Sequence, residues 1–233
     1  MDILNSLVVY ANDNKKRLGS DNDGGYIISD MSDQTYDLYL SCGIDNDVSF
    51  DVGLAKMHPD IKGYAFDGTI EKCPADMPPQ FEFVAKNIDS NESEKTTNLI
   101  PYMKDSQNIF MKMDIEGGEW FWLDTIPDEY LLKIKQLVIE FHYLGDDRFC
   151  NNYLKVKGLN RMKEHFYLIH LHGNNYNHIV NRYPYVIECT YLRKDMFEQP
   201  PEFNKTPLPM ALDMRNNIHK NDLDLNYWPY VST

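Results

Sequence analysis

Short apolar runs alternate with amphipathic segments along the middle of this 233-residue chain. Seven runs predict strands, over residues 38–42, 63–66, 81–85, 109–113, 136–141, 166–171 and 185–192. Helical spacing of apolar residues predicts helices over 48–57, from 118 past 123, and over 147–164. Continuously apolar strands separated by helices are typical of a mostly parallel sheet covered by helices on both faces. No helical pattern separates the last two strands, so the seventh is expected to run antiparallel.

The two ends of the chain have a different pattern. Residues 3–11 carry apolar side chains at helical spacing, and residues 26–28 form a short apolar run, expected to make a hairpin with the segment after Met31. Pro200, Pro201, Pro207 and Pro209 interrupt the segment after Phe197, and several aromatic residues follow them, which predicts an ordered extension packed on the domain. The chain is therefore expected to be a single domain, 1–233. It would comprise an N-terminal helix and hairpin (1–35), a Rossmann-like core (36–196) and a C-terminal extension (197–233).

Charge and cysteine usage narrow the class of protein. The net charge of −13 comes with scattered basic residues, of which Lys15 to Arg17 is the densest cluster, so nucleic acid is not an expected partner. The four cysteines form no CxxC pair, which argues against a structural zinc site and a disulfide scaffold. No signal peptide or membrane-length apolar window is present, so we expect a cytoplasmic protein without membrane insertion, whose homo-oligomeric state stays open.

Ligands of an open parallel sheet bind at the carboxyl ends of the strands, and polar residues follow these ends here. Gly43 follows the first strand, but the second and third glycines of a dinucleotide fingerprint are missing. Asp45, Asp47 and Asp51 would repel a pyrophosphate but not a sulfonium cation. Asp67, 24 residues after Gly43, is placed to accept hydrogen bonds from ribose hydroxyls. An ordinary turn with polar caps is the alternative for each of these residues.

Later strand ends carry further acids and histidines. Asn87 follows the third strand, in a loop that often lies beside the adenine in such folds. Asp114, Glu116 and Glu119 follow the fourth strand, where helix capping could explain one carboxylate but less easily three. The fifth and sixth strands each end in a pair of polar residues that alternates with an apolar one, so each pair shares one face: Glu140 with His142, and His170 with His172. Histidines suit proton transfer, although any single one is more often a structural donor.

The segment "MKMDIEGGEW" at 111–120 resembles the K-x-D-x-E-G-x-E signature of the FkbM-like methyltransferases. The resemblance extends to four other stretches and covers about residues 15–196: "RLGSDNDGGYII" at 17–28, "SCGIDNDVSFD" at 41–51, "HLHGNNY" at 170–176 and "IECTYLRKDM" at 187–196.

This resemblance implies a Rossmann-like class I methyltransferase that uses S-adenosylmethionine, and many relatives act on sugars. By position, Gly43, Ser49 and Asp67 would hold the cofactor, while Asp114 and Glu116 would face the methyl-transfer site. Asp45 stands where relatives often have glycine, and the tail after Phe197 matches no part of the family pattern.

We therefore expect an O-methyltransferase acting on a sugar or nucleotide-sugar hydroxyl. The expected base is His142 or His172, with Asp114 orienting the substrate. Substrate contacts are expected from Glu119, Asn174 and Asn175. In a variant of this mechanism, Asp114, Glu140 and Asn174 hold Mg²⁺, which binds the substrate hydroxyls.

Three alternative functions are compatible with the same residues. A metal-dependent hydrolase could use the acidic and histidine cluster, but the HExxH motif is missing. A non-catalytic carbohydrate-binding module would use the abundant tyrosines and leave Gly43 and Asp67 without a role. A nicotinamide-dependent dehydrogenase is the nearest enzyme rival, and the missing glycines argue against it.

Overall fold

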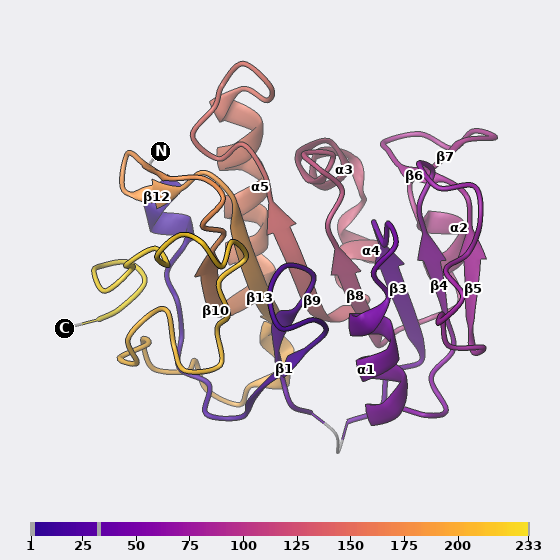
Figure 1. The fold of residues 1–233 in the computed structure, drawn as a ribbon, viewed down its shortest axis with the longest axis horizontal. Helices are drawn as coiled ribbons and strands as arrows, with labels where there is room; N and C mark the ends of the chain where they lie inside the picture. Colours follow the sequence, from indigo (N-terminus) through magenta and orange to yellow (C-terminus); the bar gives the residue numbers. More distant parts are fainter. Residues whose placement is uncertain (1–2, 32–33, 233) are drawn as a thin grey trace.

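The computed structural model describes residues 3–31 and 34–232, and a seven-stranded sheet forms its centre (Figure 1). The order across the sheet is β10-β13-β9-β8-β3-β4-β5. In chain order the strands are β3 (Leu38–Cys42), β4 (Gly63–Phe66), β5 (Phe81–Val84), β8 (Ile109–Met113), β9 (Ile134–Phe141), β10 (Phe166–Gly173) and β13 (Ile187–Arg193).

The strand directions confirm the expected sheet. β3 pairs in parallel with β4 and β8, and the pairs β4–β5 and β8–β9 are parallel as well. β13 is inserted between β9 and β10 and runs antiparallel to both. The fold is therefore α/β with a mostly parallel mixed sheet, whose last strand is antiparallel. All residues of β3 and β8 are buried, as expected for strands with both faces covered.

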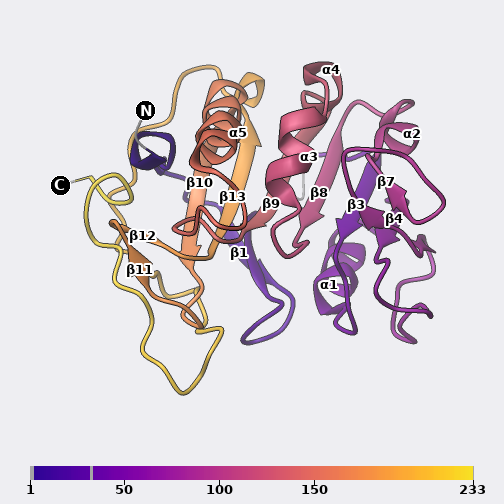
Figure 2. The ribbon, with the colours of Figure 1, turned by 90° about the horizontal axis from the view of Figure 1, so that it is seen from above.

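Helices cover both faces of the sheet (Figure 2). α1 (Ser49–Met57) lies on one face together with the hairpin of β1 (Lys15–Leu18) and β2 (Tyr26–Ser29). The other face carries α2 (Ile100–Met103), α3 (Glu119–Thr125), α4 (Asp128–Leu131) and α5 (Asn152–His165). Buried Trp120 and Leu123 of α3 pack beside Gly158 of α5. Asn151 caps α5 by accepting a hydrogen bond from the Leu154 amide at 3.0 Å.

Two predictions at the N-terminus are wrong. Only Ile3–Ser6 is helical, as a 3-10 turn, because the chain then extends along β10, where the Tyr10 amide donates to the Leu168 carbonyl at 2.8 Å. The strand β2 does form a hairpin, but its partner is β1, which precedes it. The expected partner after Met31 begins with residues 32–33, which lie outside the described residues.

The remaining strands are two-residue pairs that frame loops: β6 (Asn87–Ile88) with β7 (Thr96–Thr97), and β11 (Ile179–Val180) with β12 (Tyr183–Pro184). A second 3-10 turn, η2 (Lys194–Met196), follows β13.

The tail after Phe197 runs beside β10 without helices or strands of its own in the described part (Figure 1). Leu208, Leu225 and Tyr230 belong to the same buried apolar cluster as Leu168 of β10. Asn204 links two parts of the tail by donating to the carbonyls of Thr206 and Tyr230. Within residues 3–31 and 34–232, the helices are all too short or too polar to cross a membrane.

Candidate functional site

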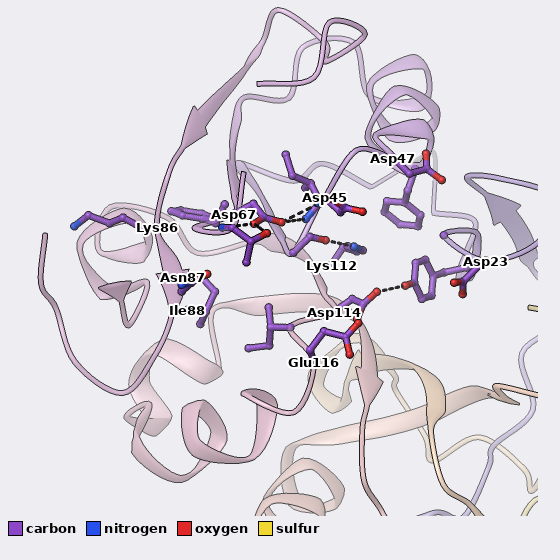
Figure 3. A pocket seen from close by; sticks show the side chains of 18 residues that line it. Asp23, Asp45, Asp47, Asp67, Lys86, Asn87, Ile88, Lys112, Asp114 and Glu116 are labelled. Carbon is purple, nitrogen blue, oxygen red and sulfur yellow. Dashed lines mark hydrogen bonds between the residues drawn. The ribbon is translucent and has the colours of Figure 1, made fainter. Parts of the chain in front are cut away.

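A cavity of about 610 Å³ opens at the carboxyl ends of β3, β4 and β8 (Figure 3). It lies where the strand order reverses, because β3 is followed by β4 on one side and has β8 on the other. This switch point is where open α/β sheets bind ligands. Its volume falls within the range of small-molecule sites. Figure 3 shows Asp67, Asn87 and Ile88 at one end and Asp23, Asp114 and Glu116 at the other.

Gly43 brings two strand ends together. Its φ of +76° lies in the left-handed region, and a Cβ at this position would lie 1.7 Å from the carbonyl oxygen of Asp114. The Gly43 amide donates to the Phe66 carbonyl of β4, and its carbonyl accepts a hydrogen bond from the buried Lys112 side chain. Glycine is therefore required by the close approach of β3 and β8, independently of any ligand.

Asp67 holds the loop that follows β3. One carboxylate oxygen accepts hydrogen bonds from the amides of Ile44 (3.1 Å) and Asp45 (2.8 Å). The other accepts from the amide (2.8 Å) and the hydroxyl (2.6 Å) of Thr69. Burial by itself raises the pKa of Asp67, but these bonds outweigh burial and hold its pKa below the ordinary value. Because these four bonds fill its lone pairs, a ribose hydroxyl would have to replace one of them.

Carboxylates dominate the cavity wall. Lys86 and Lys112 are outnumbered by six acids: Asp23, Asp45, Asp47, Asp67, Asp114 and Glu116. Asp47 is exposed, and its partial desolvation raises its pKa, but hydrogen bonds from Ser20 and Ser49 outweigh this and lower the pKa. Such a wall favours a ligand with positive charge over one with a pyrophosphate.

A chain of hydrogen bonds links the hairpin to the acidic end of the cavity. The Tyr26 hydroxyl donates to Asp114 at 2.8 Å and also faces a Glu140 oxygen at 3.3 Å. Burial first, then the charges of Asp114 and Glu188, raises the pKa of Glu140 well above its ordinary value. Burial, with the charges of Asp114 and Glu119, also raises the pKa of Glu116 against the opposing effect of His142.

His142 lies behind this wall, surrounded by carboxylates. Its Nδ1 is 3.2 Å from Glu119, and its Nε2 is 3.5 Å from Glu116 and 3.8 Å from Asp114. Burial alone would lower the pKa of His142, but the hydrogen bond to Glu119 and the surrounding negative charges raise it to about 10. In the absence of another cation, His142 is therefore protonated at neutral pH and already holds the proton that a general base would accept.

The predicted magnesium ligands do not point three oxygens at one place. Asn174 donates its amide nitrogen to Glu140 at 2.9 Å, and its oxygen accepts a hydrogen bond from the Tyr176 amide. Among the described residues, the group whose ligand atoms do converge is Asp114, Glu119 and His142, with one such atom from each within 4.8 Å of the other two.

His172 and Asn175 fasten the tail instead of lining the cavity. His172 is buried between Glu188 of β13 (3.1 Å) and Asp222 of the tail (3.0 Å). Burial lowers its pKa, but these carboxylates outweigh burial and raise it well above the ordinary value. Asn175 accepts from the Asn217 amide and donates to tail carbonyls. Since both nitrogens of His172 are engaged, it is poorly placed to meet a ligand.

The expected site residues thus fall into three groups. Five line the cavity: Gly43, Asp67, Asn87, Asp114 and Glu116. Glu119, Glu140 and His142 are buried behind its acidic end. The others lie elsewhere: Ser49 at the start of α1, hydrogen-bonded to Ser20, and His172, Asn174 and Asn175 toward the tail.

The wall residues that the sequence did not indicate include Asp23, Tyr26 and Lys112. Lys112 carried a usable signal, since a lysine inside the apolar run 109–113 must find a partner once that strand is buried. Asp23 and Tyr26 reach the cavity only because the hairpin folds over the sheet, which the local pattern does not indicate.

Comparisons with known proteins add little to this geometry. No family model matches the chain, and no curated protein matches it. Among solved structures, one match is a chain from a crystal structure of a fibrillarin/Nop5p complex. It is 15% identical with a TM-score of 0.40, and the match covers 67% of this chain and 72% of that one. A likeness at this level carries no argument about function, so membership in the FkbM-like family stays a prediction.

Proposed function

We propose that this protein is an S-adenosylmethionine-dependent methyltransferase that methylates a hydroxyl group of a sugar. The observation that carries the proposal is the acidic cavity at the switch point of a seven-stranded sheet with an antiparallel last strand. S-adenosylmethionine is a nucleoside that bears a sulfonium and an ammonium group. An acidic cavity stabilises these charges and disfavours the pyrophosphate of a nicotinamide cofactor.

The lining suits the separate parts of this cofactor. Phe66 and Ile88 provide apolar surface beside Asn87, which suits an adenine ring. Asp114 and Glu116 at the other end suit the sulfonium and ammonium groups of the cofactor. The buried ammonium of Lys112 suits the carboxylate of the cofactor. Asp67 would receive a ribose hydroxyl if the Thr69 hydroxyl turned away, since that hydroxyl is the one donor to Asp67 that can rotate freely.

The bound cofactor supplies an electrophilic methyl group. The reaction forms a bond between this methyl carbon and the substrate oxygen and breaks the carbon–sulfur bond, while the hydroxyl proton passes to the protein. We propose Glu116 as the proton acceptor, because its carboxylate lines the cavity and its side chain is 80% exposed. The expected base His142 lies behind Glu116, where it orients the carboxylates.

Aromatic rings beside Glu116 support a sugar acceptor. Tyr143 and Phe149 pack against each other with ring centroids 4.4 Å apart, and both lie close to Gly117. Phe149 is 47% exposed and its neighbour Phe121 is 42% exposed. Exposed apolar surface next to a polar cavity is typical of a binding site. The flat faces of these rings suit the C–H groups of a sugar ring.

Turnover on a panel of sugars and nucleotide-sugars tests the proposal. Release of S-adenosylhomocysteine is measured for the wild type, for Glu116→Gln and for the exposed control Glu129→Gln on α4. We expect Glu116→Gln to reduce kcat by about 10²-fold or more, as the loss of a general base does, with the control unchanged. Equal turnover of Glu116→Gln and wild type would refute the role of Glu116. No turnover of any hydroxyl acceptor by folded, cofactor-bound enzyme would refute the substrate class.

A further inference from the structure

The cluster behind the acidic end of the cavity contains two buried carboxylate oxygens without a partner. Among the described residues, neither Oδ1 of Asp114 nor Oε2 of Glu119 makes a hydrogen bond. Glu119 is fully buried, with an exposed fraction of 0%. A buried carboxylate oxygen without a donor or a cation costs free energy, because it has lost its water and gained no replacement.

The other contacts of this cluster hold its side chains in place. Glu119 accepts a hydrogen bond from the Ile115 amide at 3.0 Å through Oε1, the oxygen that also faces Nδ1 of His142. Trp120 donates its indole N–H to the carbonyl of His142 at 2.8 Å and stacks on Phe141. The side chains thus have fixed positions before any ligand arrives, as a binding site requires.

The distances suit two ligands of one ion better than a hydrogen bond. Nε2 of His142 lies 3.8 Å from Oδ1 of Asp114, which is too long for a hydrogen bond. Ligands that each lie about 2.1–2.2 Å from one ion are about 3.0–3.6 Å apart, so a small contraction closes the site. The Glu119 contact to Nδ1 then resembles the carboxylate–histidine–metal arrangement that orients an imidazole ligand.

We propose that Asp114, Glu119 and His142 form a binding site for one divalent cation. The donors are carboxylate oxygens and one imidazole nitrogen, a mixed set that suits Mn²⁺ or a neighbouring first-row ion better than Ca²⁺. Asp114 belongs both to this cluster and to the cavity wall, so the ion lies at the edge of the cavity. Its catalytic role rests on the proposed function: there it binds the acceptor hydroxyl and lowers the hydroxyl pKa.

The alternative to a bound metal ion is a protonated His142 imidazole that neutralises the surrounding carboxylates. It satisfies Oε1 of Glu119, but it faces Oδ1 of Asp114 only at 3.8 Å, without a hydrogen bond, and leaves Oε2 of Glu119 without a hydrogen-bond partner. A cation held between Nε2 of His142 and Oδ1 of Asp114 gives this Asp114 oxygen a direct partner, which is why we prefer the metal site.

Mn²⁺ binding to the full chain tests the site. The protein is treated with EDTA, dialysed and titrated with Mn²⁺ at 0.15 M salt, with free Mn²⁺ followed by electron paramagnetic resonance. The salt screens the exposed acids of this chain, whose net charge is −13. We expect one tight equivalent in the wild type. Glu119→Gln should weaken it by about tenfold or more, and Glu129→Gln should leave it unchanged.

A second variant and a spectroscopic signal cover the case in which Glu119→Gln does not fold. His142→Gln should also lose the tight equivalent, and Co²⁺ bound to the wild type should show visible bands that this variant lacks. No tight Mn²⁺ equivalent in folded wild type overturns the site, and so does binding that survives both substitutions. Cofactor binding measured in EDTA reports on the proposed function separately, so either proposal can fail while the other stands.

Discussion

Replacing Asp67 by Asn measures how strongly this carboxylate holds the loop after β3. The carboxylate accepts four hydrogen bonds, two from the amides of Ile44 and Asp45 and two from Thr69. The best orientation of Asn turns its oxygen toward the two amides and its nitrogen toward Thr69. The Thr69 hydroxyl can then rotate and accept, but the Thr69 amide is left without an acceptor.

The cost follows from these bonds. The Thr69 amide belongs to an exposed residue, so losing its acceptor costs about 1 kcal/mol, and each charged bond that becomes neutral loses roughly another 1 kcal/mol. The lower desolvation cost of Asn offsets part of this, so we expect the free energy of unfolding to fall by about 2–3 kcal/mol. The pKa of Asp67 is depressed in the folded state. Its contribution is therefore present above the unfolded pKa of about 4 and is lost as the pH falls through the folded value.

Urea unfolding followed by tryptophan fluorescence at pH 7 and at pH 2, below the depressed pKa of Asp67, provides the assay. Asp45→Asn is the matched control, because it lies in the same loop, is exposed and bonds to its neighbour Asn46. We expect this control to change stability by less than about 0.5 kcal/mol. A loss for Asp67→Asn as small as that of the control at pH 7 would refute the account of the loop. So would a loss that is equally large at both pH values.

Three further substitutions test other parts of the structure. Gly43→Ala should lower the free energy of unfolding by about 1–3 kcal/mol, because the added Cβ would meet the Asp114 carbonyl. The control Gly158→Ala in α5 should be neutral or stabilising, and thermal denaturation compares the two variants. Tyr26→Phe should cost about 1–3 kcal/mol in urea unfolding by removing the donor to Asp114, and an unchanged midpoint would count against that bond. His172 faces Glu188, Asp222 and, at longer range, Asp213, and these carboxylates raise its pKa in the folded state. The resulting stability is present below about pH 6.5 and is lost as the pH rises through the folded pKa. His172→Phe should flatten this loss of stability between pH 6 and pH 10, and an unchanged slope would refute the role of His172.

The sheet was predictable from the sequence because its strands are buried on both faces. Such strands appear as short apolar runs, and residues 38–42, 63–66 and 109–113 form strands with the predicted bounds. The N-terminal segment was not predictable in this way. Its apolar residues follow a helical period, yet their backbone groups bond to β10, a partner more than 150 positions away. Tertiary contacts override local pattern there.

The site was predictable in position but not in detail. The polar ends of β3, β4 and β8 indicated where the cavity lies, because parallel strands bring these ends to one edge. The sequence could not show that hydrogen bonds fill the lone pairs of Asp67. It also offered His172 as an alternative base to His142, because both come at the ends of predicted strands, although the tail encloses His172 through Asp222. Those contacts depend on how the loops and the tail fold over the sheet edge.

Calorimetric titration with S-adenosylmethionine, S-adenosylhomocysteine and NAD⁺ tests the central claim most directly. The acidic cavity predicts that S-adenosylmethionine and S-adenosylhomocysteine bind with one site per chain and that NAD⁺ does not bind. Asp114→Asn, which removes one charge from the wall, should weaken the cationic S-adenosylmethionine more than S-adenosylhomocysteine. Binding of NAD⁺, or no binding of either sulfur compound to the folded protein, would contradict the account.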